Sequence, residues 1–62
     1  MNIYANVVLA VCGAPYPLTA QQVWDMFPEY DESDVKDAIS RAIYERRVDW
    51  LSNRRIWRFV RG

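Results

Sequence analysis

The second half of the chain sets the strongest limit on its fold. Apolar residues recur at helical spacing from Val35 onward, and this pattern predicts an amphipathic helix over about residues 33–47. The pattern then changes directly to the alternation typical of strands, at about 48–51 and 56–60, with Asn53 as the turn residue between them. The sequence therefore predicts a helix that runs straight into a β-hairpin.

The aromatic residues of this hairpin are expected to face the core. Trp57 and Phe59 share one face of the second strand, and Trp50 shares a face of the first strand with Val48. A domain this small needs its large aromatic side chains inside, so we predict that these faces close the core and that Ile56 points away from it. The alternative is that Trp50 and Trp57 stack on nucleic-acid bases.

Two shorter helices are predicted before this unit. An apolar stripe indicates a helix over about residues 2–12 with Gly13 as its stop, although its many β-branched residues leave a strand open. After a connector with two prolines, Thr19 and Gln22 have the spacing of a capping box, which starts a second helix that the next proline ends. Leu18, just before this cap, is placed to pair briefly with the hairpin.

The composition excludes several classes of protein. A chain of 62 residues makes a single domain over 1–62, and 52% of it is hydrophobic, which indicates a folded protein. One cysteine, no histidine and two glycines leave no zinc-ligand spacing, no histidine-based triad and no phosphate loop. We therefore expect no enzyme, no cofactor or metal, and no small-molecule substrate. The apolar run at 3–12 is too short to cross a bilayer and has no basic leader, so we expect a cytoplasmic protein without a membrane segment.

The charged residues are separated along the chain. Residues 1–37 hold one lysine and six acids, net −5, whereas residues 38–62 hold seven arginines and two acids, net +5. All seven arginines lie between Arg41 and Arg61. This separation indicates a surface with an acidic and a basic pole, and arginine is well suited to bidentate contacts with phosphate.

The order of helix, short extended segment, helix, turn, helix and hairpin resembles the winged helix-turn-helix superfamily over essentially the whole chain. The matching segments are the entry to the second helix at 18–23, the apolar face of the third helix at 35–43 and the hairpin at 48–59. The resemblance implies an α+β fold with three helices followed by a β-hairpin wing. The superfamily includes many transcription regulators and also modules that bind only protein, and a stand-alone domain of this size looks like the small regulators of phages and mobile elements.

The resemblance and the arginines together favour a small DNA-binding transcriptional regulator. Its third helix would enter the major groove and its hairpin would follow the adjacent backbone. A homodimer is expected, because one such module buries too little DNA surface to be highly specific. The residues expected to contact double-stranded DNA lie on the outward side of the third helix and on the hairpin: Lys36, Ser40, Arg41, Tyr44, Arg47, Arg54, Arg55 and Arg58.

One feature of the third helix opposes this hypothesis. Asp34 and Asp37 lie in its N-terminal half, which in this superfamily enters the major groove, and carboxylates there would repel phosphate. The acids favour a second hypothesis, in which the domain is a protein-interaction module that binds or inhibits a larger partner. A third hypothesis is a subunit of a nucleoprotein complex whose arginines hold nucleic acid without sequence preference.

Overall fold

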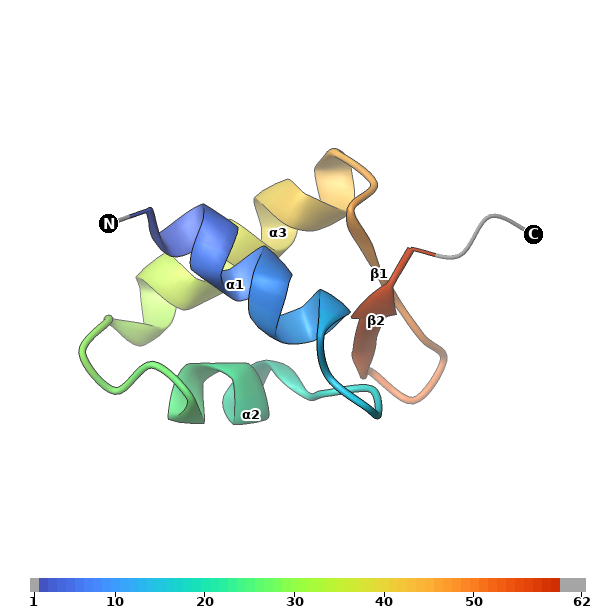
Figure 1. The fold of residues 1–62 in the computed structure, drawn as a ribbon, viewed down its shortest axis with the longest axis horizontal. Helices are drawn as coiled ribbons and strands as arrows, with labels where there is room; N and C mark the ends of the chain where they lie inside the picture. Colours follow the sequence, from blue (N-terminus) through green and yellow to red (C-terminus); the bar gives the residue numbers. More distant parts are fainter. Residues whose placement is uncertain (1, 60–62) are drawn as a thin grey trace.

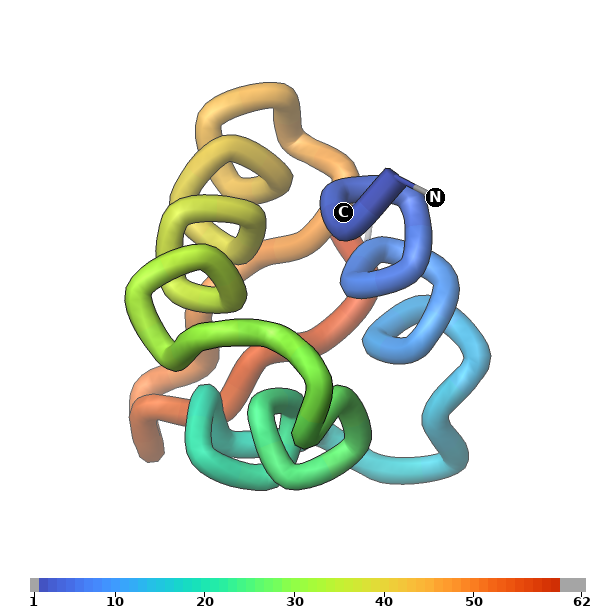
Figure 2. The backbone as a smooth tube through the Cα atoms, turned by 90° about the vertical axis from the view of Figure 1, so that its left-hand side faces the viewer, coloured from blue at the N-terminus to red at the C-terminus, as the bar shows by residue number. Residues whose placement is uncertain are grey.

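The computed structural model describes residues 2–59 of the chain and has three helices followed by a two-stranded antiparallel hairpin. The elements are α1 (Ile3–Cys12), α2 (Ala20–Asp25), α3 (Glu32–Tyr44), β1 (Val48–Trp50) and β2 (Ile56–Arg58). In Figures 1 and 2, α1 and α3 lie side by side, α2 closes one side of this pair, and the hairpin packs on both long helices at the end away from the N-terminus. This is the α+β layout of a winged helix, as the sequence predicted. The predicted end of the second strand at residue 60, and Arg61, lie outside the described residues.

The first helix begins and ends close to the predicted residues. The Asn2 side chain accepts a hydrogen bond from the Tyr4 N–H at 3.0 Å, and at the other end the Gly13 N–H donates to the Leu9 carbonyl at 2.9 Å. Gly13 has a right-handed φ of −88°, so this stop does not need glycine for a left-handed turn. A Cβ atom there would lie 3.0 Å from the Leu9 carbonyl oxygen, a tighter contact than most Cβ atoms make, so the absence of a side chain relieves crowding at this turn.

The second helix has the predicted start and an earlier end. Both bonds of the capping box are present, from the Gln22 N–H to Thr19 Oγ1 at 3.1 Å and from the Thr19 N–H to Gln22 Oε1 at 2.8 Å. The helix ends at Asp25, before Phe27, whose N–H donates to the carbonyl three residues back. Such bonds tighten the last turn, and the chain then turns toward α3.

The third helix ends three residues before its predicted end at 47, and it ends without glycine. Arg46 takes the left-handed conformation, with φ of 59°. Its N–H donates to the Ile43 carbonyl at 3.0 Å, and the Arg47 N–H donates to the Ala42 carbonyl at 2.9 Å. These two bonds form a Schellman motif, in which the left-handed position is usually glycine.

The prediction that the hairpin aromatics close the core is wrong. Ile56 and Val48 are fully buried, whereas Trp50 is 46% exposed and Trp57 is half-buried without belonging to the core. The predicted pairing of Leu18 with the hairpin is confirmed, because Leu18 and Ile56 exchange backbone hydrogen bonds at 3.0 and 2.6 Å. This pairing sets the β2 backbone beside the chain that enters α2, with Ile56 in the core.

Branched and small side chains fill the space between α1, α3 and the hairpin. The buried residues of the described chain are all aliphatic, and tight interiors of this kind leave no room for a tryptophan in place of an isoleucine. They are Val7, Val11, Leu18, Val23, Val35, Ala38, Ile39, Ala42, Val48 and Ile56. The wide rings of Trp50 and Trp57 are therefore left at the surface of the hairpin.

Candidate nucleic-acid interface

The exposed side chains of α3 divide between two flanks. Asp34, Asp37 and Arg41 line a hollow of about 260 Å³ that α3 forms with the first turn of α1. Lys36 and Ser40 line a hollow on the other flank, toward the hairpin. The two acids that opposed DNA binding in the sequence therefore lie on the flank of α3 that faces α1, away from the hairpin.

Trp50 stands at the centre of the hairpin-side flank. It borders two hollows, one of about 410 Å³ shared with Ala20 and Arg54, and one of about 190 Å³ that reaches α3. We call this combined surface the Trp50 groove. It is lined by Ala20, Lys36, Ile39, Ser40, Trp50 and Arg54. The groove joins the start of α2, the outer side of α3 and the hairpin turn, three elements that lie together in Figure 2.

The hairpin turn holds two arginines beside this groove. Arg54 takes a left-handed conformation, with φ of 62°, and its N–H donates to the Leu51 carbonyl at 3.1 Å. The Arg55 N–H donates to Asn53 Oδ1 at 3.2 Å, so Asn53 is the turn residue that was predicted. The Arg55 guanidinium donates to Gln22 Oε1 at 3.4 Å, which places it next to α2. Neither arginine has a carboxylate partner among the described residues.

Two of the arginines expected to contact DNA form ion pairs with a surface carboxylate of the same chain. Glu45 accepts from Arg41 Nε at 3.3 Å and lies 3.9 Å from Arg47 Nε. The Tyr4 hydroxyl of α1 also donates to Glu45, and the Arg41 guanidinium lies 4.6 Å from the centre of the Tyr4 ring. We call these four residues the Glu45 cluster.

Hydrogen bonding shifts both titratable groups at the centre of this cluster. The bond from the Tyr4 hydroxyl, helped by Arg41, holds the pKa of Glu45 below its usual range. The same bond raises the pKa of the Tyr4 phenol, since a charged carboxylate disfavours the phenolate. Glu45 therefore stays ionised at neutral pH and keeps part of the charge of Arg41 and Arg47 engaged.

The remaining predicted residues lie apart from the Trp50 groove. Tyr44 projects from α3 with 88% of its surface exposed. The Arg58 guanidinium lies over the neighbouring Trp57 ring, 4.4 Å from its centre. Arg46, which the sequence argument left out, is exposed and has no carboxylate partner within the described residues.

The structure thus brings together three of the predicted site residues and adds one. Lys36, Ser40 and Arg54 share a groove, and Trp50 was missed as its centre because a tryptophan was expected in the core. The Arg41 and Glu45 pair has the helical spacing of four residues that was visible in the sequence. The contact of Glu45 with Tyr4, 41 residues away, had no signal in the sequence.

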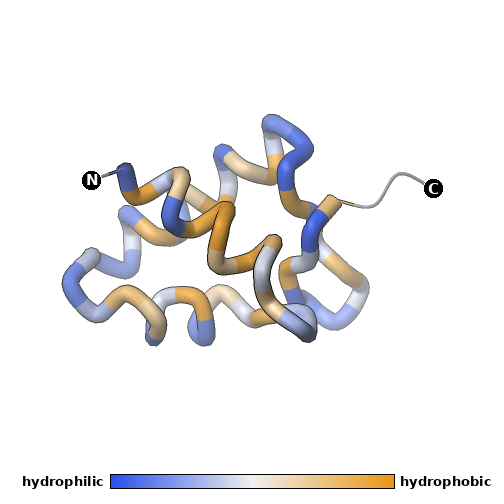
Figure 3. Tube along the Cα trace, in the orientation of Figure 1, coloured by the Kyte–Doolittle hydropathy of each residue, from blue (hydrophilic) through white to orange (hydrophobic). Residues whose placement is uncertain are grey.

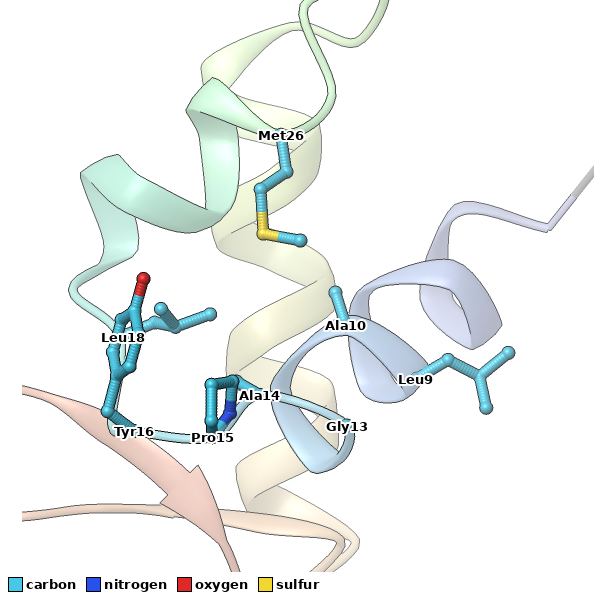
Figure 4. Close-up of a pocket in the computed structure, with 8 residues that line it drawn as sticks. All are labelled: Leu9, Ala10, Gly13, Ala14, Pro15, Tyr16, Leu18 and Met26. Carbon is cyan, nitrogen blue, oxygen red and sulfur yellow. The ribbon is translucent and has the colours of Figure 1, made fainter.

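An uncharged hollow of about 360 Å³ lies on the other side of α2 from the hairpin turn. Its exposed members are Leu9, Tyr16 and Met26, which are 70%, 57% and 52% exposed. Figure 4 shows its lining, which comes from the second half of α1, the connector and the end of α2: Leu9, Ala10, Gly13, Ala14, Pro15, Tyr16, Leu18 and Met26. We call it the α1–α2 hollow.

No protein-family model, curated protein or solved structure matches the chain. Over residues 2–59, His, Cys, Asp and Glu form no group able to hold a metal ion. In the same part of the chain, every helix is too short or too polar to cross a membrane.

Proposed function

We propose that the chain is a small DNA-binding regulator that holds double-stranded DNA with α3 and the hairpin. One observation carries the proposal. The Trp50 groove joins Lys36 and Ser40 of α3 to Arg54 of the hairpin turn, while Asp34 and Asp37 lie on the other flank of the helix. The main objection from the sequence is thereby weakened, because the acids need not face the phosphates that the arginines contact.

In winged-helix domains that bind DNA, the third helix and the hairpin contact different parts of the DNA, and the positions of Lys36, Ser40 and Arg54 suit this arrangement. With α3 in the major groove, the turn of the hairpin reaches the adjacent backbone, where unpaired arginines form charge-assisted bonds with phosphate oxygens. Within residues 2–59, Arg54 and Arg55 have no carboxylate partner, which suits this role. Lys36 and Ser40, on the hairpin side of α3, are placed to contact base edges or the flanking phosphates.

A salt-titrated binding assay on duplex DNA tests the proposal, and the chain offers a matched pair of variants. Arg46 and Arg54 are both exposed, both left-handed and both without a carboxylate partner among the described residues, but only Arg54 lines the groove. Arg54→Gln is expected to lower the salt slope by about 0.9, the value for one lost phosphate contact. Arg46→Gln is expected to leave the slope unchanged. The proposal fails if the unaltered protein shows no affinity for mixed-sequence duplex at low salt and ~10⁻⁵ M, within the range of non-specific binding.

The expected homodimer has a suitable surface in the α1–α2 hollow. None of its lining residues carries a charge at neutral pH, so two copies related by a twofold axis would meet there without opposed like charges. Both poles of the molecule lack this property. Sedimentation over a range of concentrations is expected to show a dimer that Leu9→Glu converts to a monomer; a protein that stays monomeric at high concentration contradicts this use of the hollow.

Docking on a different protein is the second candidate function, and the same exposed hollow favours it. The DNA-binding and sedimentation assays above distinguish the two candidate functions. A chain that is monomeric and does not bind duplex DNA leaves protein docking as the better hypothesis, with Leu9, Tyr16 and Met26 as its contact residues.

A further inference from the structure

Trp50 is the most exposed tryptophan among the described residues. It is 46% exposed and lies outside the core and the residues packed against it. Its backbone N–H donates to the Asp49 carboxylate, but its indole N–H makes no hydrogen bond within the described residues. Tryptophan is highly buried on average, so an exposed ring that borders two hollows indicates a contact surface.

The surroundings of the ring restrict what the groove can bind. Ala20 and Ile39 are small or buried, so they form an apolar floor next to the indole. Two cations line the hollows that Trp50 borders: Arg54 of the hairpin turn lines one, and Lys36 of α3 lines the other, with its ammonium 3.9 Å from the Glu32 carboxylate. A flat apolar wall between two positive charges suits a ligand that has a flat ring and negative groups on both sides of it. A nucleotide within a strand has this form, with a base and a phosphate at each end of its sugar.

We propose that the Trp50 groove holds one unpaired nucleotide, with its base stacked on Trp50 and its flanking phosphates on Arg54 and Lys36. The inference rests on the proposed DNA binding and makes its target more specific. Bases inside an intact duplex are covered on both faces by their neighbours, whereas an unpaired base at the end of a duplex has a free face for an aromatic side chain. The chain then prefers a duplex with a single-stranded extension to the same duplex with blunt ends.

The preference can be measured with three DNA molecules of equal duplex length: blunt, extended by a few nucleotides, and extended with abasic sites in place of the unpaired bases. The abasic extension keeps the phosphates and removes the rings. Since stacking on an aromatic side chain changes affinity by about 5- to 150-fold per base, the intact extension is expected to bind tighter than the other two by a factor in this range.

Variants of the two hairpin tryptophans separate stacking from the stability of the hairpin. Trp50→Ala is expected to lose the preference for the intact extension, and Trp50→Phe to keep much of it. Trp57→Ala is the matched control, because the Trp57 ring is covered by Arg58 and does not border the groove. Quenching of tryptophan fluorescence by the extended DNA is expected in the unaltered protein and in Trp57→Phe, but not in Trp50→Phe.

The outcomes distinguish this inference from the proposed function. Equal affinity of the unaltered protein for blunt, extended and abasic DNA overturns the inference and leaves duplex binding in place. A preference that survives in a folded Trp50→Ala also overturns it. Absence of binding to all three DNA molecules at low salt removes the proposed function, and the inference with it. If Trp50→Ala does not fold, the abasic DNA and the fluorescence of Trp50→Phe still decide the question.

Discussion

Ile56 and Trp57 are neighbours in β2 with opposite surroundings. The Ile56 side chain is fully buried among α1, α3 and Leu18, whereas Trp57 lies half-buried beneath the Arg58 guanidinium at the surface. A buried aliphatic residue stabilises through its transfer from water and through close packing, and its removal leaves a cavity. The smaller of the two side chains therefore contributes more to stability.

Alanine substitutions at these two positions are expected to differ in cost. Ile56→Ala should lower the free energy of unfolding by about 2–5 kcal/mol, a large part of the total for a domain of this size. Trp57→Ala should cost about 1 kcal/mol or less, because only part of its ring leaves water and a surface cation–π contact is weak. Urea denaturation followed by circular dichroism measures both values. A larger loss for Trp57→Ala would mean that the opposite face of β2 packs on the core.

Arg46 carries the backbone strain at the end of α3. The left-handed conformation costs about 1–2 kcal/mol for a residue other than glycine. Glycine avoids this cost, but its greater conformational freedom in the unfolded chain cancels part of the stabilisation. Arg46→Gly is therefore expected to stabilise the fold by about 0.5–1 kcal/mol. Arg46→Ala removes the same charge and keeps the strain, so it should show no gain. Equal melting temperatures for the two variants would contradict the strain at this position.

At the scale of elements, the sequence predicted the features that depend on neighbouring residues better than those that depend on residues far apart in the chain. The capping box of Thr19 and Gln22 and the apolar face of α3 act within one or two turns, so the sequence alone identified them. The facing of the hairpin depends on Leu18, which is far from Ile56 in the chain and pairs with it through the backbone. A three-residue strand offers too few alternating positions to define its buried face. The Val48 face of β1 is buried as predicted, but in β2 the size of the aromatic rings favoured the wrong face.

The candidate site shows the same division. The arginines of the hairpin turn and the cation of α3 were found from their positions along the chain. The sequence did not reveal that the flanks of α3 differ, with acids toward α1 and Lys36 toward the hairpin, because this depends on where α1 and β1 pack. It also did not reveal that Trp50 was available, since Trp50 pairs with the buried Ile56 in the hairpin and is still 46% exposed.

The bond between Tyr4 and Glu45 joins α1 to the end of α3, and its contribution to stability is expected to depend on pH. Glu45 has a lowered pKa, so this stabilisation is present above about pH 4.3 and is lost as the pH falls through the folded value. Tyr4 has a raised pKa, so the stabilisation is present below about pH 10 and is lost as the pH rises through the folded value.

Melting curves of Tyr4→Phe across pH test this linkage. The difference in melting temperature from the unaltered protein should be largest between about pH 5 and pH 9 and should shrink outside this window. Tyr44→Phe is the control, because Tyr44 is 88% exposed and its hydroxyl makes no hydrogen bond within the described residues. A difference for Tyr4→Phe that is constant across the whole range would show that the ring, and not the hydrogen bond, stabilises the contact.

At the scale of the whole molecule, the charge separation in the sequence becomes a separation in space. In Figure 1 the turn between α2 and α3, which is acidic in sequence, lies at one end of the molecule, and the segment after α3 and the hairpin turn, which carry arginines, lie toward the other end. Both regions are largely hydrophilic in Figure 3. Such a field orients the domain on a polyanion with its basic end first. Glu45 is an exception, because it is an acid among the arginines and engages two of them.

Replacing Glu45 with an uncharged residue is therefore expected to raise the affinity for DNA by more than the removal of one negative charge alone would. In Glu45→Gln the amide oxygen can still accept from Tyr4, but Arg41 and Arg47 lose their carboxylate partner. Arg47 becomes available to phosphate, whereas Arg41 stays on the α1 flank of α3 with Asp34 and Asp37. The affinity for duplex DNA should rise, and the salt slope should steepen by about 0.9, the value for one added phosphate contact. Glu29→Gln is the matched control, since it makes the same change of net charge in the acidic turn before α3, whereas Glu45 follows α3. A helix of 13 residues is about 20 Å long, which exceeds the screening length of ~8–10 Å. Binding measured across a series of salt concentrations separates the two variants. If both raise the affinity equally with unchanged slopes, the gain comes from net charge alone, and the Glu45 cluster does not restrain Arg47.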